Sequence, residues 1–240
     1  MAASGVEKKI LGVIGGLGPM ATACFMELVT DLTDAGSDQD HIETVIISRP
    51  KTPDRTAFIT GKSSEDPYPY LLDSGKMLKD AGAGIIAVPC ITARYFKDRL
   101  EEELGVPVIH GVDEAAARLA AKGIRKAGIM ATDGSIKAGI IRGILEVHGI
   151  EAVVPDEEYQ KDVMSLIYDD VKTGRKPDLS KMEAVREHLV SKGAGAVILG
   201  CTELSVISLR YGLNNDFFDI LEVLAEQAVV MCGGKVRKKD

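Results

Sequence analysis

A segment of ten residues occurs twice in the sequence, and this repeat constrains the fold more than any other feature. Residues 81–90 (AGAGIIAVPC) align without a gap on residues 192–201 (KGAGAVILGC), 111 positions later. The short apolar segment 11–14 (LGVI) likewise matches residues 127–130 (AGIM), 116 positions later. Offsets of this size are those of small domains, so the 240-residue chain is expected to contain two similar halves.

Short apolar runs alternate with helical patterns along most of the chain. Strands are expected near residues 9–14, 43–48, 84–88, 107–110, 127–130, 151–154 and 196–199. Helices are expected at residues 20–32, 115–122, 136–148, 160–172 and 181–192. Because strand and helix alternate, the sheets should be parallel. The strands consist mostly of Ile, Val and Ala, which predicts that helices cover both faces.

The predicted fold class is therefore α/β, with two similar Rossmann-like halves related by a pseudo-two-fold. The first half would comprise residues 1–115 together with about 212–240, and the second residues 116–211. Ligands of such sheets bind beyond the carboxyl ends of the strands. The active site is accordingly expected in the cleft between the halves.

Charge and hydropathy exclude two classes of partner. The formal net charge is −7, and the one dense basic run is residues 235–239 (KVRKK), which argues against nucleic acid. No apolar run approaches the roughly 20 residues that span a bilayer, and residues 1–9 lack the apolar segment of a signal peptide. The sequence predicts a cytoplasmic protein that does not insert into membranes.

The four cysteines are expected to be free thiols: Cys24, Cys90, Cys201 and Cys232. They are too few for a disulfide scaffold at this length, and they form no CxxC pair or closely spaced Cys and His that would bind a metal. Cys90 and Cys201 differ from the other two because each ends a copy of the repeated segment.

These two cysteines each precede an expected helix with a nearby threonine, Thr92 or Thr202, which we expect to cap it. The positive end of a helix favours a thiolate. Two thiols from pseudo-symmetric halves suit a nearly symmetric task, such as removing a proton from one face of a carbon and adding one to the other. The pair indicates acid/base chemistry that inverts a stereocentre. The alternative is a pair of buried structural thiols.

Four short motifs, taken together, resemble those of the aspartate/glutamate racemases, cofactor-independent amino-acid racemases grouped with hydantoin racemase. The motifs are residues 15–19 (GGLGP), 53–56 (PDRT), 89–93 (PCITA) and 200–204 (GCTEL). Residues 131–135 (ATDGS) and 160–164 (QKDVM) are also similar to the family pattern. The resemblance covers nearly the whole chain and implies a homodimer that interconverts L- and D-aspartate or glutamate without pyridoxal phosphate or a metal.

The resemblance also implies roles for individual residues. Cys90 and Cys201 would be the catalytic acid/base pair. Thr92 and Thr202 would bind the α-carboxylate and amino group of the substrate, and Arg55 its side-chain carboxylate, with Lys172 a weaker candidate for the same anion. The remaining expected substrate-binding residues are Gly16, Ile91, Thr132 and Glu203.

The chain departs from the family pattern in the first cysteine motif. The family usually has Asn directly after this cysteine and often His three residues further on, where this chain has Ile91 and Arg94. We expect Ile91 to face the substrate and to alter substrate choice without removing the proton donor. The alternative is that Ile91 packs inward as part of the core.

The sequence alone leaves other functions open. Residues 16–21 fit the loose dinucleotide pattern GxGxxA, but the second expected strand ends in Ser48 and Arg49 and lacks the acidic residue that this pattern requires. No lysine is placed for a pyridoxal phosphate Schiff base. The resemblance also leaves open hydantoin racemase, maleate isomerase and arylmalonate decarboxylase, relatives on the same scaffold; decarboxylases of this type keep one of the two cysteines, so the presence of Cys90 and Cys201 disfavours them. The non-enzymatic alternative is a small-molecule sensor or a protein that has lost catalysis and retains the cleft. His110 and Asp219 are two further residues that we expect near the cleft.

Overall fold

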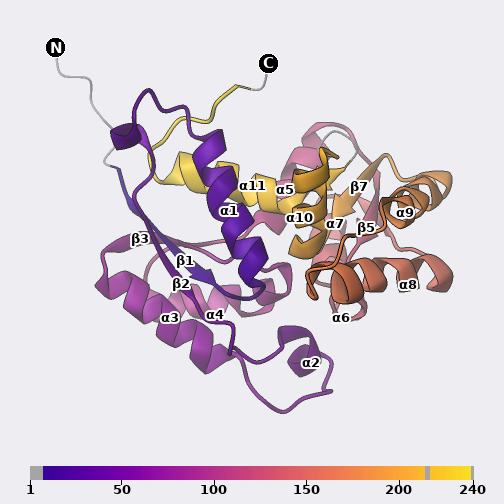
Figure 1. Ribbon diagram of the computed structural model, residues 1–240, viewed down its shortest axis with the longest axis horizontal. Helices are drawn as coiled ribbons and strands as arrows, with labels where there is room; N and C mark the ends of the chain where they lie inside the picture. Colours follow the sequence, from indigo (N-terminus) through magenta and orange to yellow (C-terminus); the bar gives the residue numbers. More distant parts are fainter. Residues whose placement is uncertain (1–7, 214–216, 239–240) are drawn as a thin grey trace.

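The computed structural model describes residues 8–213 and 217–238 and shows two halves side by side, each built on its own parallel sheet (Figure 1). The first sheet has the strand order β2-β1-β3-β4, and the second has the order β6-β5-β7-β8. The two orders coincide when β1 is matched with β5, β2 with β6, β3 with β7 and β4 with β8. The predicted α/β fold of two similar halves is confirmed.

The first sheet consists of β1 (Ile10–Gly15), β2 (Thr44–Ser48), β3 (Ala83–Ala87) and β4 (Val108–Ile109). The helical segments along this part of the chain are α1 (Pro19–Leu32), η1 (Asp38–Asp40), α2 (Arg55–Ile59), α3 (Tyr68–Asp80), η2 (Ile91–Phe96) and α4 (Lys97–Leu104). The central strands β1 and β3 are almost entirely buried, because helices cover both of their faces.

The second sheet consists of β5 (Lys126–Met130), β6 (Glu151–Val153), β7 (Ala196–Leu199) and β8 (Phe218–Asp219). Its helical segments are α5 (Gly111–Ala121), α6 (Asp133–Lys137), α7 (Ile140–Val147), α8 (Glu157–Ser165), α9 (Leu179–Ser191) and α10 (Thr202–Tyr211). A π-helical segment, η3 (Leu166–Val171), follows α8 directly. The last helix is α11 (Ile220–Met231).

The end of the chain is shared between the halves. Strand β8 pairs in parallel with β7 and so extends the second sheet, although residues 212–240 were expected to join the first half. Helix α11 instead packs against α1 and α5, and its apolar residues enter the same core as β1 and β3. The boundaries between the halves near residues 115 and 212 remain a proposal. Residues 1–7 and 239–240, at the two ends of the chain, lie outside the described residues.

The halves touch closely beside the cleft, where α2 meets α6. A Cβ atom at Gly134 in α6 would lie 1.9 Å from Cγ2 of Thr56 in α2. A side chain at position 134 would require the Thr56 side chain, or α2 that carries it, to shift. Glycine at this position therefore allows the halves to close around the ends of β3 and β7.

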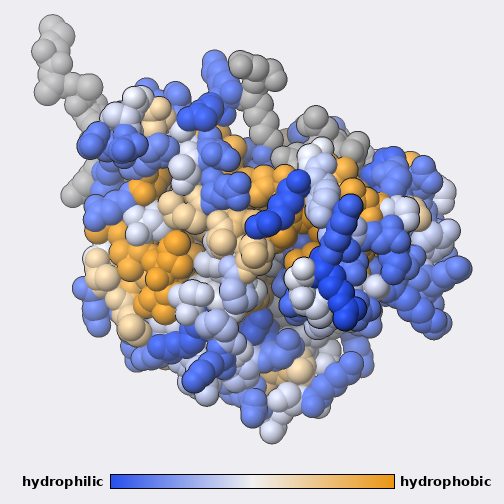
Figure 2. Space-filling model, viewed as in Figure 1, coloured by the Kyte–Doolittle hydropathy of each residue, from blue (hydrophilic) through white to orange (hydrophobic). Residues whose placement is uncertain are grey.

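Apolar residues gather on one face of the molecule over the first sheet (Figure 2). Strand β2 is the edge of this sheet, and Ile46 in β2 and Met77 in α3 are exposed large apolar side chains. Within the described residues, no helix combines the length and apolar character needed to cross a membrane.

Candidate active site

A cavity of about 30 Å³ lies where the two halves meet, and each half contributes seven lining residues. From the first half these are Leu17, Asp54, Arg55, Thr56, Cys90, Ile91 and Thr92, and from the second Thr132, Tyr168, Lys172, Gly200, Cys201, Thr202 and Glu203. Cys90 and Cys201 lie a few residues beyond the carboxyl ends of β3 and β7, which is where open α/β sheets bind ligands.

Nine of the ten predicted site residues line this cavity, and the exception is Gly16. Gly16 has a φ of 82°, and a Cβ atom there would lie 2.3 Å from the backbone nitrogen of Arg49. Its own N–H donates to Oγ1 of Thr22 at 2.9 Å. Glycine is therefore required at this position by the turn between β1 and α1 and by the close approach of the chain at Arg49.

Cys90 is held by hydrogen bonds at both ends of its peptide unit. Its N–H donates to the carbonyl oxygen of Val88 at 2.7 Å, and its carbonyl oxygen accepts from the N–H of Ala93 at 3.0 Å. The same carbonyl oxygen lies 3.1 Å from Nε2 of His110. The side chain is 8% exposed. The backbone that carries this thiol is thus firmly fixed.

Cys201 interacts through its side chain. Its Sγ lies 2.9 Å from Oε2 of Glu203, a buried carboxylate two residues further along the chain. Burial raises the pKa of Cys201 well above its usual range, and the negative charge of Glu203 and the hydrogen bond to it raise it further. The positive end of the helix was expected to favour a thiolate at Cys201, but burial and Glu203 outweigh this effect. The sulfur is a thiol that donates to the carboxylate.

The expected threonine caps are wrong. Cys90 and Cys201 themselves occupy the N-cap positions of η2 and α10, and neither helix start has a side-chain cap. Thr92 and Thr202 fall inside the helices, and both line the cavity. Their hydroxyl groups are therefore not committed to capping.

Arg55 makes several contacts that the sequence did not indicate. It begins α2, which is capped by Asp54 through a 2.7 Å hydrogen bond from the N–H of Ala57. Its guanidinium donates to three backbone carbonyl oxygens, those of Leu17 at 3.0 Å, Thr52 at 3.2 Å and Pro53 at 2.9 Å. Its Nε is buried and has no hydrogen-bond partner among the described residues. Arg55 thus ties two loops together and keeps one donor unused.

Lys172 follows the π-helical segment η3 and lines the same cavity. Its Nζ lies 4.0 Å from the ring centroid of Tyr168, a cation–π contact. Burial acts to lower the pKa of Lys172, but Glu203, Tyr168, Cys201 and Asp54 together raise it by more, so the ammonium stays charged. No motif in the sequence singled out Tyr168, although its spacing of four residues from Lys172 places both on the same side of a helix.

Ile91 and Thr132 line the cavity, and each also has a structural role. Ile91 is 4% exposed and packs in a core cluster with Val112 and Ala116. Thr132 caps α6, since its Oγ1 accepts from the N–H of Ser135 at 3.2 Å. Both residues therefore shape the cavity wall, and only a small part of each is exposed.

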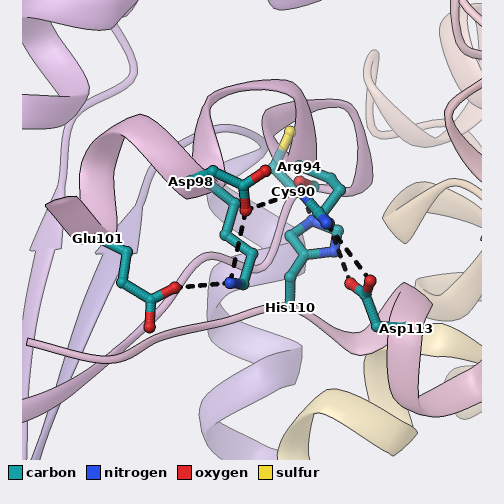
Figure 3. Close-up of polar contacts among 7 residues, drawn as sticks. Cys90, Arg94, Asp98, Glu101, His110 and Asp113 are labelled. Carbon is teal, nitrogen blue, oxygen red and sulfur yellow. Dashed lines mark hydrogen bonds and ion pairs between the residues drawn. The ribbon is translucent and has the colours of Figure 1, made fainter.

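The residue that replaces the family histidine, Arg94, does not line the cavity. Its Nε and Nη2 bind the carboxylate of Asp113 at 2.9 and 3.3 Å, and Nη1 lies 3.4 Å from Asp98 (Figure 3). Burial and the ion pairs oppose each other, and the pairs prevail, so the pKa of Arg94 is raised. Arg94 therefore joins η2 to α5.

His110 directly follows β4 and Asp219 ends β8; both are buried, but neither lines the cavity. Burial lowers the pKa of His110 to about 4. Burial raises the pKa of Asp219 to about 6, although Ser205 Oγ and the N–H of Leu221 donate to its carboxylate at 2.6 and 2.8 Å. His110 contacts the carbonyl oxygen of Cys90, whereas Asp219 contacts Ser205, four residues after Cys201.

Within residues 8–213 and 217–238, no group of three or more His, Cys, Asp or Glu residues is arranged to hold a metal ion. The polar groups of the cavity are two thiols, two cations, two carboxylates and several hydroxyls. These groups can bind a zwitterion and move protons.

Comparison with known proteins identifies the family of the chain. A family model described as Asp/Glu/hydantoin racemase matches residues 14–228. The chain is 25% identical to the broad specificity amino-acid racemase RacX of Bacillus subtilis over 204 residues, covering 82% of this chain and 87% of that one. Its structure is similar to the Picrophilus torridus aspartate racemase, with a TM-score of 0.79, 30% identity and 96% coverage of both chains. It is also similar to an aspartate racemase homologue from Pyrococcus horikoshii, with a TM-score of 0.75, 25% identity, and coverage of 93% of this chain and 99% of that one. The chain therefore belongs to the Asp/Glu/hydantoin racemase family, as its motifs predicted.

Proposed function

We propose that the protein is an amino-acid racemase that interconverts the L and D forms of aspartate or glutamate, with Cys90 and Cys201 as its two proton carriers and no cofactor. The observation that carries this proposal is the position of the two thiols. They stand at equivalent places in the two halves and line one cavity. A pair of opposed proton carriers is what inversion at a carbon requires.

The reaction needs one thiolate and one thiol. The thiolate takes the α-proton, and the electron pair of the broken C–H bond is left on the α-carbon, stabilised by the adjacent carboxylate group. The opposing thiol then gives its proton to the other face of the same carbon. The proton count is unchanged, and the two sulfurs have exchanged protonation states. The reverse reaction starts from this exchanged state.

The contact between Cys201 and Glu203 supports an order for these steps. In the free protein Cys201 donates a hydrogen bond to the Glu203 carboxylate at 2.9 Å. We infer that Cys201 starts as the acid and Cys90 as the base. The free protein reaches the exchanged state when Cys201 passes its proton to Glu203, which releases it to solvent, and Cys90 takes one proton from solvent.

The charges of the cavity match a dicarboxylic amino acid. Arg55 and Lys172 are cations, and Asp54 and Glu203 are carboxylates. Aspartate or glutamate brings two carboxylates and one ammonium group. The unpaired Nε of Arg55 is a donor suited to a carboxylate oxygen, and charge-assisted hydrogen bonds of this kind are among the strongest.

The cavity lies between the halves and is lined by both of them. We infer that the amino acid binds there and that the halves close around it, the contact between Gly134 and Thr56 being one place where they meet. Closure would also exclude water from the thiols.

The test is incubation of the purified protein with L-aspartate, L-glutamate and L-alanine in deuterium oxide. The α-proton content and the chirality are read together. We expect deuterium to enter and the D form to appear for one of the two dicarboxylic acids. Cys90→Ala and Cys201→Ala should each abolish racemisation. Retention of more than about a tenth of the wild-type rate in either variant, a barrier change below roughly 1.4 kcal/mol, contradicts the two-thiol reaction.

Three further measurements complete the proposal. Conversion of maleate to fumarate, instead of racemisation, would favour an isomerase of the same scaffold. Activity of a colourless preparation, with absorbance from aromatic side chains alone, would support a reaction without pyridoxal phosphate. A homodimer, which the family resemblance implies, is tested by sedimentation of the full chain.

A further inference from the structure

His110 lies directly behind the first thiol and contacts its backbone. The imidazole Nε2 is 3.1 Å from the carbonyl oxygen of Cys90, and this contact is buried (Figure 3). The residue is 4% exposed. It comes from the end of β4, a strand adjacent to β3, so it joins two neighbouring strands at the edge where the cavity lies.

The geometry fixes the form of this imidazole. A carbonyl oxygen can only accept, so Nε2 must carry the proton that it donates. Nδ1 is buried and has no hydrogen-bond partner among the described residues. A proton on Nδ1 would leave a buried donor unpaired, so the ring is neutral with its proton on Nε2. Burial acts in the same direction, since it lowers the pKa of His110 to about 4.

Charged neighbours support the same form. Arg94 and Lys97 act to lower the pKa of His110, and Asp113 acts to raise it. Asp113 is occupied by Arg94, which binds both of its carboxylate oxygens. The ion pair thus leaves the imidazole free to donate to Cys90 (Figure 3).

The second half holds its thiol differently. The carbonyl oxygen of Cys201 accepts from the N–H groups of Leu204 and Ser205 at 3.0 and 3.4 Å. Asp219, which ends the strand that corresponds to β4, accepts from Ser205 Oγ. The Cys201 thiol is instead bound directly by Glu203. The two thiols therefore depend on different supports, and damage to one support should affect one thiol.

We propose that His110 is a positioning residue that fixes the Cys90 sulfur against its face of the substrate by holding the Cys90 carbonyl. The proposal rests on the two-thiol function proposed above. Without the imidazole bond, the Cys90 carbonyl keeps the bond from Ala93 alone, and the turn can rotate about it. Small displacements of a reacting group cost large factors in rate.

The experiment measures α-proton exchange on each face separately. In Cys201→Ala, Cys90 is the one remaining carrier and should exchange the α-proton of one enantiomer for deuterium without inversion. In Cys90→Ala, Cys201 should do the same for the other enantiomer. We expect His110→Leu to slow the exchange by Cys90 about tenfold or more, and the exchange by Cys201 by less than about twofold.

Two variants control for general damage. His110→Gln keeps a donor at a similar distance and should restore part of the Cys90 exchange. His148→Leu makes the same substitution at the end of α7, away from the cavity lining, and should leave both exchanges unchanged. A loss of folding would slow the exchange by Cys90 and the exchange by Cys201 together. Unequal slowing therefore shows that His110 acts on the position of one thiol.

The outcomes separate the two proposals. If His110→Leu slows both faces equally, or neither, His110 has no positioning role and the two-thiol reaction stands. If neither single-cysteine parent exchanges the α-proton, both proposals fail. Nitrogen NMR of the intact wild-type protein decides the case even if His110→Leu does not fold. A neutral ring protonated on Nε2 is expected at pH 7, and a ring protonated on Nδ1 overturns the proposal.

Discussion

The thiol of Cys201 and the carboxylate of Glu203 lie 2.9 Å apart, two residues from each other at the start of α10. Their contact raises the pKa of Cys201, because a negative charge beside a thiol opposes its ionisation. It also places a proton acceptor beside a sulfur that must alternate between thiol and thiolate. The same carboxylate thus stabilises the acid form and can receive its proton.

Glu203→Gln should lower the pKa of Cys201. The amide keeps the size of the side chain but removes its charge, so one of the causes of the raised pKa disappears while burial remains. In a Cys90→Ala background, the rate of alkylation of Cys201 by iodoacetamide should reach its midpoint at a lower pH than with Glu203 present. Racemisation in the Cys90-containing enzyme should fall, because the proton acceptor is gone. A midpoint that stays in place or rises would show that Glu203 does not act on this thiol.

The buried groups His110 and Asp219 should give opposing pH dependences of stability. His110 has its pKa lowered from 6.5 to about 4, so the unfolded chain binds its proton first and stability falls as the pH drops from 6.5 to 4. Asp219 has its pKa raised from 3.8 to about 6, so the folded chain binds its proton first and stability rises as the pH drops through 6. Each effect is on the order of 3 kcal/mol, and the two nearly cancel.

Single variants expose this cancellation. Between pH 6.5 and pH 4, Asp219→Asn should lose about 3 kcal/mol more unfolding free energy than wild type, and His110→Gln about 3 kcal/mol less. Urea unfolding at the two pH values measures both, and the exposed carboxylates common to all three proteins cancel in the comparison. Parallel profiles for the three proteins would mean that these side chains are not buried as described.

Arg55→Ala should damage turnover of aspartate and glutamate far more than turnover of any neutral amino acid that the enzyme accepts. The lost charge-assisted bond to a side-chain carboxylate is worth roughly 2 to 3 kcal/mol, or 30- to 150-fold in kcat/KM. The melting temperature should fall as well, because the carbonyls of Leu17, Thr52 and Pro53 lose their donors. Equal losses of kcat/KM for aspartate and alanine would show that Arg55 makes its loop contacts and does not bind the side-chain carboxylate of the substrate.

The repeat predicted the fold and the central pair of the site because both follow from strand ends. Residues at the same place in two copies of a strand must lie at the same edge of two similar sheets, and the cleft brings Cys90 and Cys201 to one cavity. The family motifs added the loops that carry Arg55 and Thr132. These features depend on the order of strands and helices along the chain, which the pattern of apolar residues indicates.

Contacts made by side chains were not predictable in the same way. The bond from Cys201 to Glu203 depends on a rotamer, and the three carbonyls bound by Arg55 come from loops whose course the sequence does not define. Strand β8 has two residues and does not lie in an apolar run of the kind that indicated β4, so its place in the second sheet was missed. The inward packing of Ile91 depends on the direction of one side chain at the start of η2.

Ile91→Asn tests what this departure from the family means. The side chain is 4% exposed and packs with Val112 and Ala116, so a buried amide there would lose apolar contacts and leave polar groups unpaired. We expect a loss of roughly 3 kcal/mol in unfolding free energy and no gain in kcat/KM for aspartate or glutamate. Ile91→Val, which removes one methylene without adding a polar group, is the matched control and should cost about 1 kcal/mol. Urea unfolding and kinetics on the same preparations measure both quantities. A stable Ile91→Asn protein with kcat/KM raised about tenfold would show instead that this position faces the substrate, where the new amide makes one net hydrogen bond, and that isoleucine limits the choice of acidic substrates.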